Sequence, residues 1–195
     1  AIILSQGLVS NPLKPVDKTV ENLPTLIDRM VFPGIQGGPH MHTIAAKAVA
    51  FGEAATPDFQ KYCQQILKNA KRLADEMMKR GFKLITNGTD NHLILADVKT
   101  SFDLDGGEVE EVLDKIGLTL NKNVIPDDPL PPFKPSGIRL GTPAITTRGL
   151  KEDDMTKVAE WMHQAIVNRH DAKILNKLSN EIREFCLQFP LPSDK

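Results

Sequence analysis

The sequence contains few cysteines, few aromatic residues and no excess of either charge. Its only cysteines, Cys63 and Cys186, lie far apart and outside any CxxC or Cys/His spacing, so neither a disulfide framework nor a structural zinc site is expected. Lys plus Arg (24) nearly balance Asp plus Glu (25), which argues against nucleic acid or an anionic membrane as a partner. No hydrophobic run approaches membrane-spanning length. This composition favours a soluble, cytoplasmic protein.

The chain opens on AIILSQ, an apolar run typical of a strand. The run is too short for a signal peptide and has no basic flank. Because it starts on Ala1 and not on methionine, we expect the chain to begin inside a longer protein. From residue 7 to the glycines near residue 38 we expect little regular core. The whole chain, with 195 residues of which 41% are hydrophobic, can bury the core of one domain or a little more.

Periodic apolar residues predict two helices in the first half of the chain. The first covers about residues 42–51, with Pro39 just upstream, where a proline is tolerated. The second is the clearest element of the sequence, because Thr56 can cap it, Pro57 occupies its first position and Gly81 ends it. Its apolar stripe predicts one face buried against a core.

The second half of the chain has the pattern of an α+β unit. The predicted elements are, in order, the strands FKLIT (82–86) and HLILADV (92–98), a helix over 108–116, the strand LTLN (118–121), a proline-rich loop VIPDDPLPPFKPSG, the strand IRLGT (138–142), and two helices over about 151–169 and 171–188. TDNH (89–92) is typical of a turn. FDLDGGEVEE begins like a calcium loop but lacks its glycine and final glutamate, so Asp105 and Gly106 are interpreted as a helix entry.

The segment FPGIQGGPHMH (32–42) places consecutive glycines directly before a helix. The backbone amides of Gly37 and Gly38 can converge on an anion near the positive end of the helix dipole, which makes a phosphate site one interpretation. A tight turn is the other, because the spacing matches neither a P-loop nor a GxGxxG fingerprint. His40 and His42 form an HxH pair without a third ligand at a helical interval, so no metal site is expected.

Arg139 is the sharpest candidate for a binding residue. It lies alone in an otherwise apolar strand within SGIRLGTPAITTRG, where a half-buried guanidinium needs an anion. Its planar fork suits two-point contact with a carboxylate, and a structural salt bridge remains the alternative. Upstream, Asn121 and Asn123 form a polar strand end before the rigid proline-rich loop, which either grips a flat ligand or is simply surface.

These motifs together resemble the C-terminal portion of serine hydroxymethyltransferase, the pyridoxal-phosphate enzyme that interconverts serine and glycine with tetrahydrofolate. FPGIQGGPHMH, AAKAVAFGEA, TDNHLILADV, LNKN, PPFKPSGIRLGTPAITTRG and the closing tryptophan-bearing helix follow the family's order and spacing over essentially all 195 residues. The resemblance implies that residues 1–56 are a remnant of the large domain of a fold-type I pyridoxal-phosphate enzyme. Residues 57–195 would then be its small C-terminal α+β domain with a long leading helix.

The resemblance also assigns roles to individual residues. Gly37 and Gly38 would offer amides to the pyridoxal phosphate of a neighbouring subunit, so that the complete enzyme is a homodimer or larger. Arg139 would bind the carboxylate of serine or glycine. Asn123 and Phe133 would contact the folate. The sequence departs from the family pattern at Ile35, His40 and Val124, where glycine, leucine and serine are common; Val124 stands beside the folate residues.

The catalytic lysine that the family uses to form a Schiff base with the cofactor lies upstream, in a Thr-rich HK motif that this sequence does not contain. We therefore expect no catalytic residue in these 195 residues and no activity of this chain alone. Lys47 is expected to be a surface residue. Two alternatives stay open: a threonine aldolase-like enzyme, against which Asn123 and the PPF segment argue, and a folded module without catalysis that binds a partner half.

Overall fold

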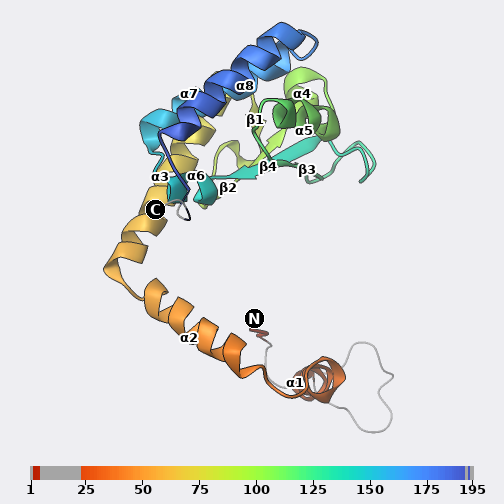
Figure 1. Ribbon diagram of the computed structural model, residues 1–195. Helices are drawn as coiled ribbons and strands as arrows, with labels where there is room; N and C mark the ends of the chain where they lie inside the picture. The colour runs from red at the N-terminus through yellow and green to blue at the C-terminus, as the bar shows by residue number, and fades with distance from the viewer. Residues whose placement is uncertain (1, 5–22, 192, 194–195) are drawn as a thin grey trace. The chain divides into compact units, whose positions relative to one another are not determined.

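The computed structural model describes residues 2–4, 23–191 and 193 (Figure 1). The chain divides into two compact units, Ala1–Ala55 and Thr56–Lys195, which are described separately below. The polar passage that follows AIILSQ, residues 7–22, lies outside the described residues. Residues 2–4 have no regular secondary structure, so the strand predicted at AIILSQ is not found in the part that is described.

The first unit contains three short helical elements, α1 (Leu23–Arg29), the π-helix η1 (Met30–Ile35) and α2 (Met41–Ala54). Helix α2 was predicted, and with His40 as its N-cap, Pro39 lies just upstream of the helix as expected. Helices α1 and η1 were not expected. None of their described residues is buried, so they form regular structure without a core of their own.

The second unit begins with the long helix α3 (Pro57–Lys79), and both of its predicted ends are confirmed. The Thr56 hydroxyl accepts a hydrogen bond from the Phe59 N–H at 3.3 Å. At the other end Gly81 has a φ of 87°, and the N–H of Phe82 returns to the Met77 carbonyl at 3.1 Å. This is the hydrogen-bond pattern of a glycine-terminated helix.

A four-stranded antiparallel sheet forms the centre of this unit. Its strands are β1 (Lys83–Leu84), β2 (Leu93–Asp97), β3 (Asn121–Asn123) and β4 (Gly137–Gly141), in the spatial order β1-β2-β4-β3. The prediction of a strand over residues 118–121 was wrong, because the ladder starts only at Asn121. Leu120 is buried in the core, so its apolar character reflects side-chain packing and not strand pairing.

The two outer strands are each capped by a side chain. On β1 the Lys83 N–H donates to the Ser101 hydroxyl at 2.8 Å. On β3 the Lys122 N–H donates to the Glu110 carboxylate at 3.1 Å. Both side chains belong to helices that come after β2 in the sequence. Part of the hydrogen-bonding capacity at the edges of the sheet is therefore satisfied within the unit.

The remaining elements are η2 (Ile85–Asn87), α4 (Val98–Phe102), α5 (Gly106–Lys115), α6 (Pro143–Arg148), α7 (Glu152–Val167) and α8 (Ala172–Leu187). Helices α5, α7 and α8 were predicted, and Asp105 caps α5 in a reciprocal capping box with Glu108. The short helices α4 and α6 were missed. Pro143 at the first position of α6 and Gly149 just after its end are signals that could have identified it.

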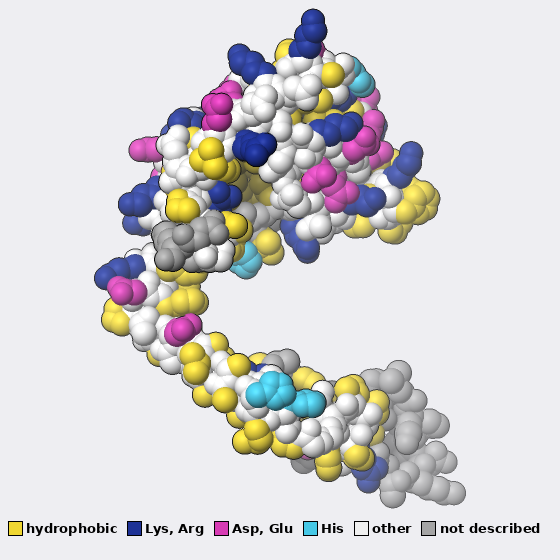
Figure 2. All heavy atoms as spheres, viewed as in Figure 1, with side chains coloured by type: hydrophobic (Ala, Val, Ile, Leu, Met, Phe, Trp, Pro, Cys, Tyr) yellow, Lys and Arg dark blue, Asp and Glu magenta, His cyan; other side chains and the backbone are white. Residues whose placement is uncertain are grey.

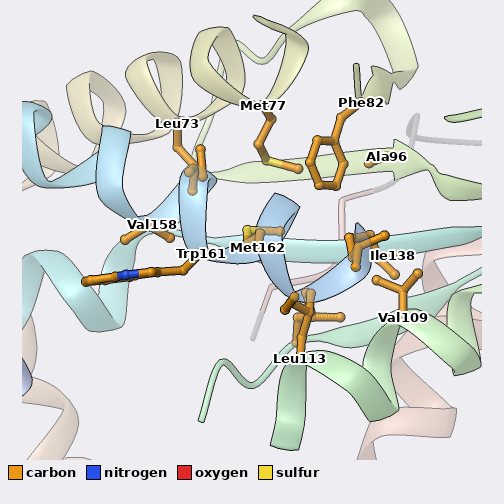
Figure 3. Packing of buried hydrophobic residues seen from close by; sticks show 14 of the residues in the cluster. Leu73, Met77, Phe82, Ala96, Val109, Leu113, Ile138, Val158, Trp161 and Met162 are labelled. Atoms are coloured by element: carbon orange, nitrogen blue, oxygen red, sulfur yellow. The ribbon is translucent and has the colours of Figure 1, made fainter. Parts of the chain in front are cut away.

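The hydrophobic core lies on one face of the sheet (Figure 3). Ile138 of β4 and Ile94 of β2 point into this core and are fully buried. Figure 3 shows residues of α3, α5 and α7, including Met77, Leu113 and Met162, around Ile138. Because side chains alternate along a strand, Arg139 falls on the opposite face and is exposed. The confirmed fold is therefore a small α+β unit with helices over one face of its sheet.

A buried carboxylate links α3 to α7. Glu76 is buried in α3 and accepts hydrogen bonds from Lys79 Nζ at 2.7 Å and Arg80 Nη1 at 2.6 Å. Arg80 Nε continues to Glu160 of α7 at 2.9 Å. The hydrogen bonds from Lys79 and Arg80 outweigh the effect of burial and lower the pKa of Glu76 from its ordinary value of 4.5 to about 2.

We expect this carboxylate to make the unit less stable in acid. Because the folded-state pKa of Glu76 is depressed, its contribution to the free energy of unfolding is present above pH 4.5 and is lost as the pH falls toward 2. Urea unfolding followed by the fluorescence of Trp161 at several pH values measures this loss. The variant Glu76→Gln should start less stable and lose less over the same interval; an equal loss in both proteins would contradict the assignment.

Candidate functional site

The exposed face of the sheet carries a pocket of about 360 Å³. It brings together two residues predicted from the sequence, Arg139 from β4 and Asn123 from β3. Its lining is completed by the segment between β1 and β2 and by the two leucines of β2. The lining residues are Ile85, Thr86, Gly88, Thr89, Asp90, Asn91, Leu93, Leu95, Asn123 and Arg139.

Strand register places Arg139 and Asn123 on the same face. Arg139 pairs with Leu95 of β2 and with Asn121 of β3, and Asn123 pairs with Gly137 two residues before the arginine. Directly paired residues share a face, as do residues two apart on one strand. The two polar side chains therefore stand over a floor that includes Leu95.

The surroundings of Arg139 differ from the expectation of a half-buried guanidinium. The side chain is exposed, because none of the described helices of the unit covers this face of the sheet. Among the ion pairs of the described residues, none involves Arg139. The salt-bridge alternative thus has no carboxylate partner in that part of the chain. Asp90 is the acidic residue in the lining of the same pocket.

One wall of the pocket is a tight turn with left-handed backbone. Thr86 has a φ of 63° and Asn87 a φ of 54°; for a β-branched threonine this conformation is strained. The turn chemistry predicted for TDNH is confirmed: the Thr89 hydroxyl donates to the Leu93 carbonyl at 2.5 Å, and the Asn91 side chain accepts from the Leu93 N–H at 2.7 Å. These bonds give the wall a fixed shape.

The proline-rich loop between β3 and β4, residues 124–136, is organised around Asp128. We call this segment the proline loop. The Asp128 carboxylate accepts hydrogen bonds from the backbone N–H groups of Ile125, Leu130 and Ser136, at 3.2, 2.9 and 3.0 Å, and from the Ser136 hydroxyl at 2.6 Å. Burial raises the pKa of Asp128, but the hydrogen bonds outweigh it and lower the pKa to about 2.

Sequence reasoning missed Asp128 altogether. One of its contacts was recognisable, because an aspartate that bonds the N–H two residues later, here that of Leu130, is the usual Asx turn. The contacts to Ile125 and Ser136 were not recognisable, since they depend on the course of the whole loop. Phe133, which belongs to this loop, is 74% exposed.

Two glycines allow the proline loop and the sheet to pack closely beside α5. A Cβ on Gly137 would lie 2.7 Å from the Asn123 carbonyl oxygen, and one on Gly106 would lie 2.1 Å from the Gly137 carbonyl oxygen. The Gly106 N–H also donates to the Pro135 carbonyl at 2.7 Å. The helix entry predicted at Asp105 and Gly106 is confirmed, and it holds the loop at Pro135, four residues before Arg139.

The glycine-rich segment of the first unit is exposed. Gly37 and Gly38 lie just before α2 and have no positive φ. A Cβ on either would meet no described residue within 4 Å apart from its own neighbours along the chain. Nothing in the described residues therefore requires glycine at these positions. Backbone free of side chains suits close approach by a group from outside the chain, and a cofactor phosphate fits that description.

The first unit also displays apolar side chains, which Figure 2 shows along its length. On α2 the exposed residues include Met41, Ile44, Val49 and Phe51. Lys47 is exposed, as predicted, and lines a hollow of about 890 Å³ within this unit. The rings of His40 and His42 lie 5.6 Å apart in an edge arrangement.

Among the described residues, no three His, Cys, Asp or Glu side chains come together as metal ligands. None of the described helices combines the length and the apolar character needed to cross a membrane.

The sheet and the helices on one of its faces make the second unit a small α+β domain, a fold compatible with the small domain of a pyridoxal-phosphate enzyme. The family model for serine hydroxymethyltransferase matches residues 1–162. The chain belongs to this family, and the resemblance carried by the motifs is confirmed. Members are pyridoxal-phosphate-dependent transferases of one-carbon metabolism, which act on serine, glycine and folates.

Proposed function

We propose that this chain supplies the substrate-binding half of a serine hydroxymethyltransferase, which in complete form interconverts serine plus tetrahydrofolate with glycine plus methylenetetrahydrofolate. In that form it acts as a cytoplasmic homodimer or larger assembly in glycine biosynthesis. The observation that carries the proposal is the pocket itself. Its exposed Arg139 has no ion-pair partner among the described residues and shares the lining with Asn123.

Arg139 binds the carboxylate of the amino acid in this proposal. A guanidinium presents two parallel N–H donors to a carboxylate, which fixes orientation as well as position. Leu93 and Leu95 line the same pocket, and their apolar surface reduces competition from water for these bonds. The arginine thus orients the bond of the substrate that reacts.

Asn123 and Phe133 bind the folate. The Asn123 amide nitrogen donates to the Val124 carbonyl at 2.6 Å, which orients the side chain and directs its oxygen to accept from a ligand N–H. Phe133 offers an exposed ring face on which a flat pteridine can stack. Val124 stands where serine is frequent in the family, and it lacks the hydroxyl that could make a polar contact beside the folate.

Gly37 and Gly38 bind the phosphate of the cofactor in a neighbouring subunit. Pyridoxal phosphate, when bound, supplies the electron sink for the reaction. Residues 1–56 are the remnant of the large cofactor domain in this proposal, and 57–195 form the small domain. Because the Thr-rich HK motif with the Schiff-base lysine is not in this sequence, these 195 residues alone hold no cofactor covalently and catalyse no turnover.

Titration calorimetry of the 195-residue chain tests the proposal. We expect saturable but weak binding of glycine and of 5-formyltetrahydrofolate, with dissociation constants of roughly 1 mM, about 4 kcal/mol of binding free energy each. Glycinamide, which lacks the carboxylate, is the matched control for glycine and should not bind. Asn123→Ala should lose the folate and keep glycine.

The failure of either titration is informative. Binding of glycine without any folate binding would favour the threonine aldolase-like alternative. The absence of saturable binding of both ligands would favour a folded module that does not recognise substrates. Turnover of serine by the chain alone would contradict the proposed inactivity.

A further inference from the structure

The proline loop is closed at both ends by one carboxylate. Asp128 accepts from the N–H of Ile125, just after β3, and from the N–H and hydroxyl of Ser136, just before β4. It also accepts from the N–H of Leu130 in the middle of the loop. Each carboxylate oxygen has two donors, so the charge is compensated although the side chain is partly buried.

The loop has few other internal restraints. Within residues 124–136 the remaining backbone hydrogen bond is that of the Lys134 N–H to the Pro131 carbonyl, at 2.8 Å. Its prolines narrow the conformations of single residues, but they donate no hydrogen bonds. The ladder between β3 and β4 sets the distance between the ends of the loop. The course of the loop depends on Asp128 and on the backbone bonds at its last residues, from the Gly106 N–H to the Pro135 carbonyl and from the Val98 and Lys99 N–H groups to the Ser136 carbonyl.

We propose that Asp128 is a positioning residue for the folate side of the site: its carboxylate holds the proline loop in the shape that presents Asn123 and Phe133 to the ligand. The proposal rests on the proposed function, because it takes a reduced folate as that ligand. Asp128 does not touch the ligand. It acts by fixing the backbone two residues after Asn123, at Ile125, and on either side of Phe133, at Leu130 and Ser136.

The variant Asp128→Asn tests this role because it preserves volume and removes one acceptor oxygen. The Leu130 N–H donates to one carboxylate oxygen of Asp128 and the Ile125 N–H donates to the other. In either orientation of the asparagine, its NH₂ group therefore faces at least one backbone N–H that has lost its acceptor. The matched control is Asp127→Asn, which removes the same charge from the adjacent exposed residue. Asn tolerates the left-handed φ of 53° at that position.

Two readouts are measured on the full 195-residue chain. Amide hydrogen exchange of Ile125, Leu130 and Ser136 should quicken by about tenfold in Asp128→Asn, and that of Ile94 in the core strand should not change. The dissociation constant for 5-formyltetrahydrofolate should rise by about tenfold. Asp127→Asn should match the unmodified chain in both readouts, and Ser136→Ala, which loses only the hydroxyl donor, should lie between them.

The outcomes separate the two proposals. Folate binding by the unmodified chain that is equal in Asp128→Asn and Asp127→Asn would overturn the positioning role, whatever happens to exchange. Unchanged exchange of the three loop amides would overturn it as well. A chain that binds no folate at all would instead overturn the folate assignment, and with it the ligand half of this inference.

Discussion

Gly106→Ala is expected to destabilise the second unit by about 3 kcal/mol. A Cβ at this position would lie 2.1 Å from the Gly137 carbonyl oxygen and 3.0 Å from that of Pro135. Both atoms belong to the backbone, so no side-chain rotation can relieve the clash. Helix α5 would have to move away from β4, which would also break the hydrogen bond from the Gly106 N–H to Pro135.

Gly107→Ala is the matched control for this change. A Cβ there would meet only side-chain atoms, Asp105 Oδ1 at 3.1 Å and Lys122 Cδ at 3.7 Å, which can move. Because alanine is the better helix former, this variant should be neutral or more stable by up to about 1 kcal/mol. Urea unfolding of both variants, followed by the fluorescence of Trp161, gives the difference. Equal free energies of unfolding for the two variants would show that α5 and β4 are not in close contact.

Arg139→Ala is expected to weaken serine binding in the complete enzyme by about 3 kcal/mol, a factor of roughly 150. The loss arises from the two charge-assisted hydrogen bonds that a guanidinium makes to one carboxylate. Arg139→Lys keeps the charge but not the fork, so we expect an intermediate loss. The melting temperature should stay unchanged in both variants, because the side chain is exposed and has no ion pair among the described residues.

The control for the arginine series is Arg183→Ala, which removes an exposed arginine from α8. It should bind serine as the unmodified enzyme does. Serine affinity is measured by titration, separately from turnover, so that a loss of binding is not confused with a loss of catalytic rate. If Arg139→Ala bound serine as tightly as Arg183→Ala, the carboxylate assignment would be wrong.

Local signals determined which helices could be predicted from the sequence. Helix α3 was identified from end to end because its cap at Thr56, its first proline and its terminal glycine all lie within a few residues of its ends. Helix α4 has five residues, too few for an apolar period to appear. The strand was predicted too early in the sequence, at residues 118–121, because apolar Leu120 was interpreted as part of it. Leu120 is apolar because it is buried in the core, and the polar residues that follow it form the ladder.

The site was only partly predictable for a similar reason. Arg139 and Asn123 were identified as single residues, but strand register brings them together, and register follows from the pairing of β3 with β4. The exposure of Arg139 was not predicted, because sequence does not reveal which face of a sheet its helices cover. Asp128 was missed because its donors come from three points along the proline loop.

The capped edges of the sheet restrict how this domain can associate with other chains. The Ser101 hydroxyl occupies an N–H on β1, and the Glu110 carboxylate occupies one on β3. An incoming strand would have to displace these side chains before its own backbone could pair there. Growth of the sheet from copy to copy, the route to fibres, is thereby opposed at both ends. The face of the sheet that carries Arg139 stays open to other molecules. Binding there takes place through side chains, so it depends on which residues the face presents.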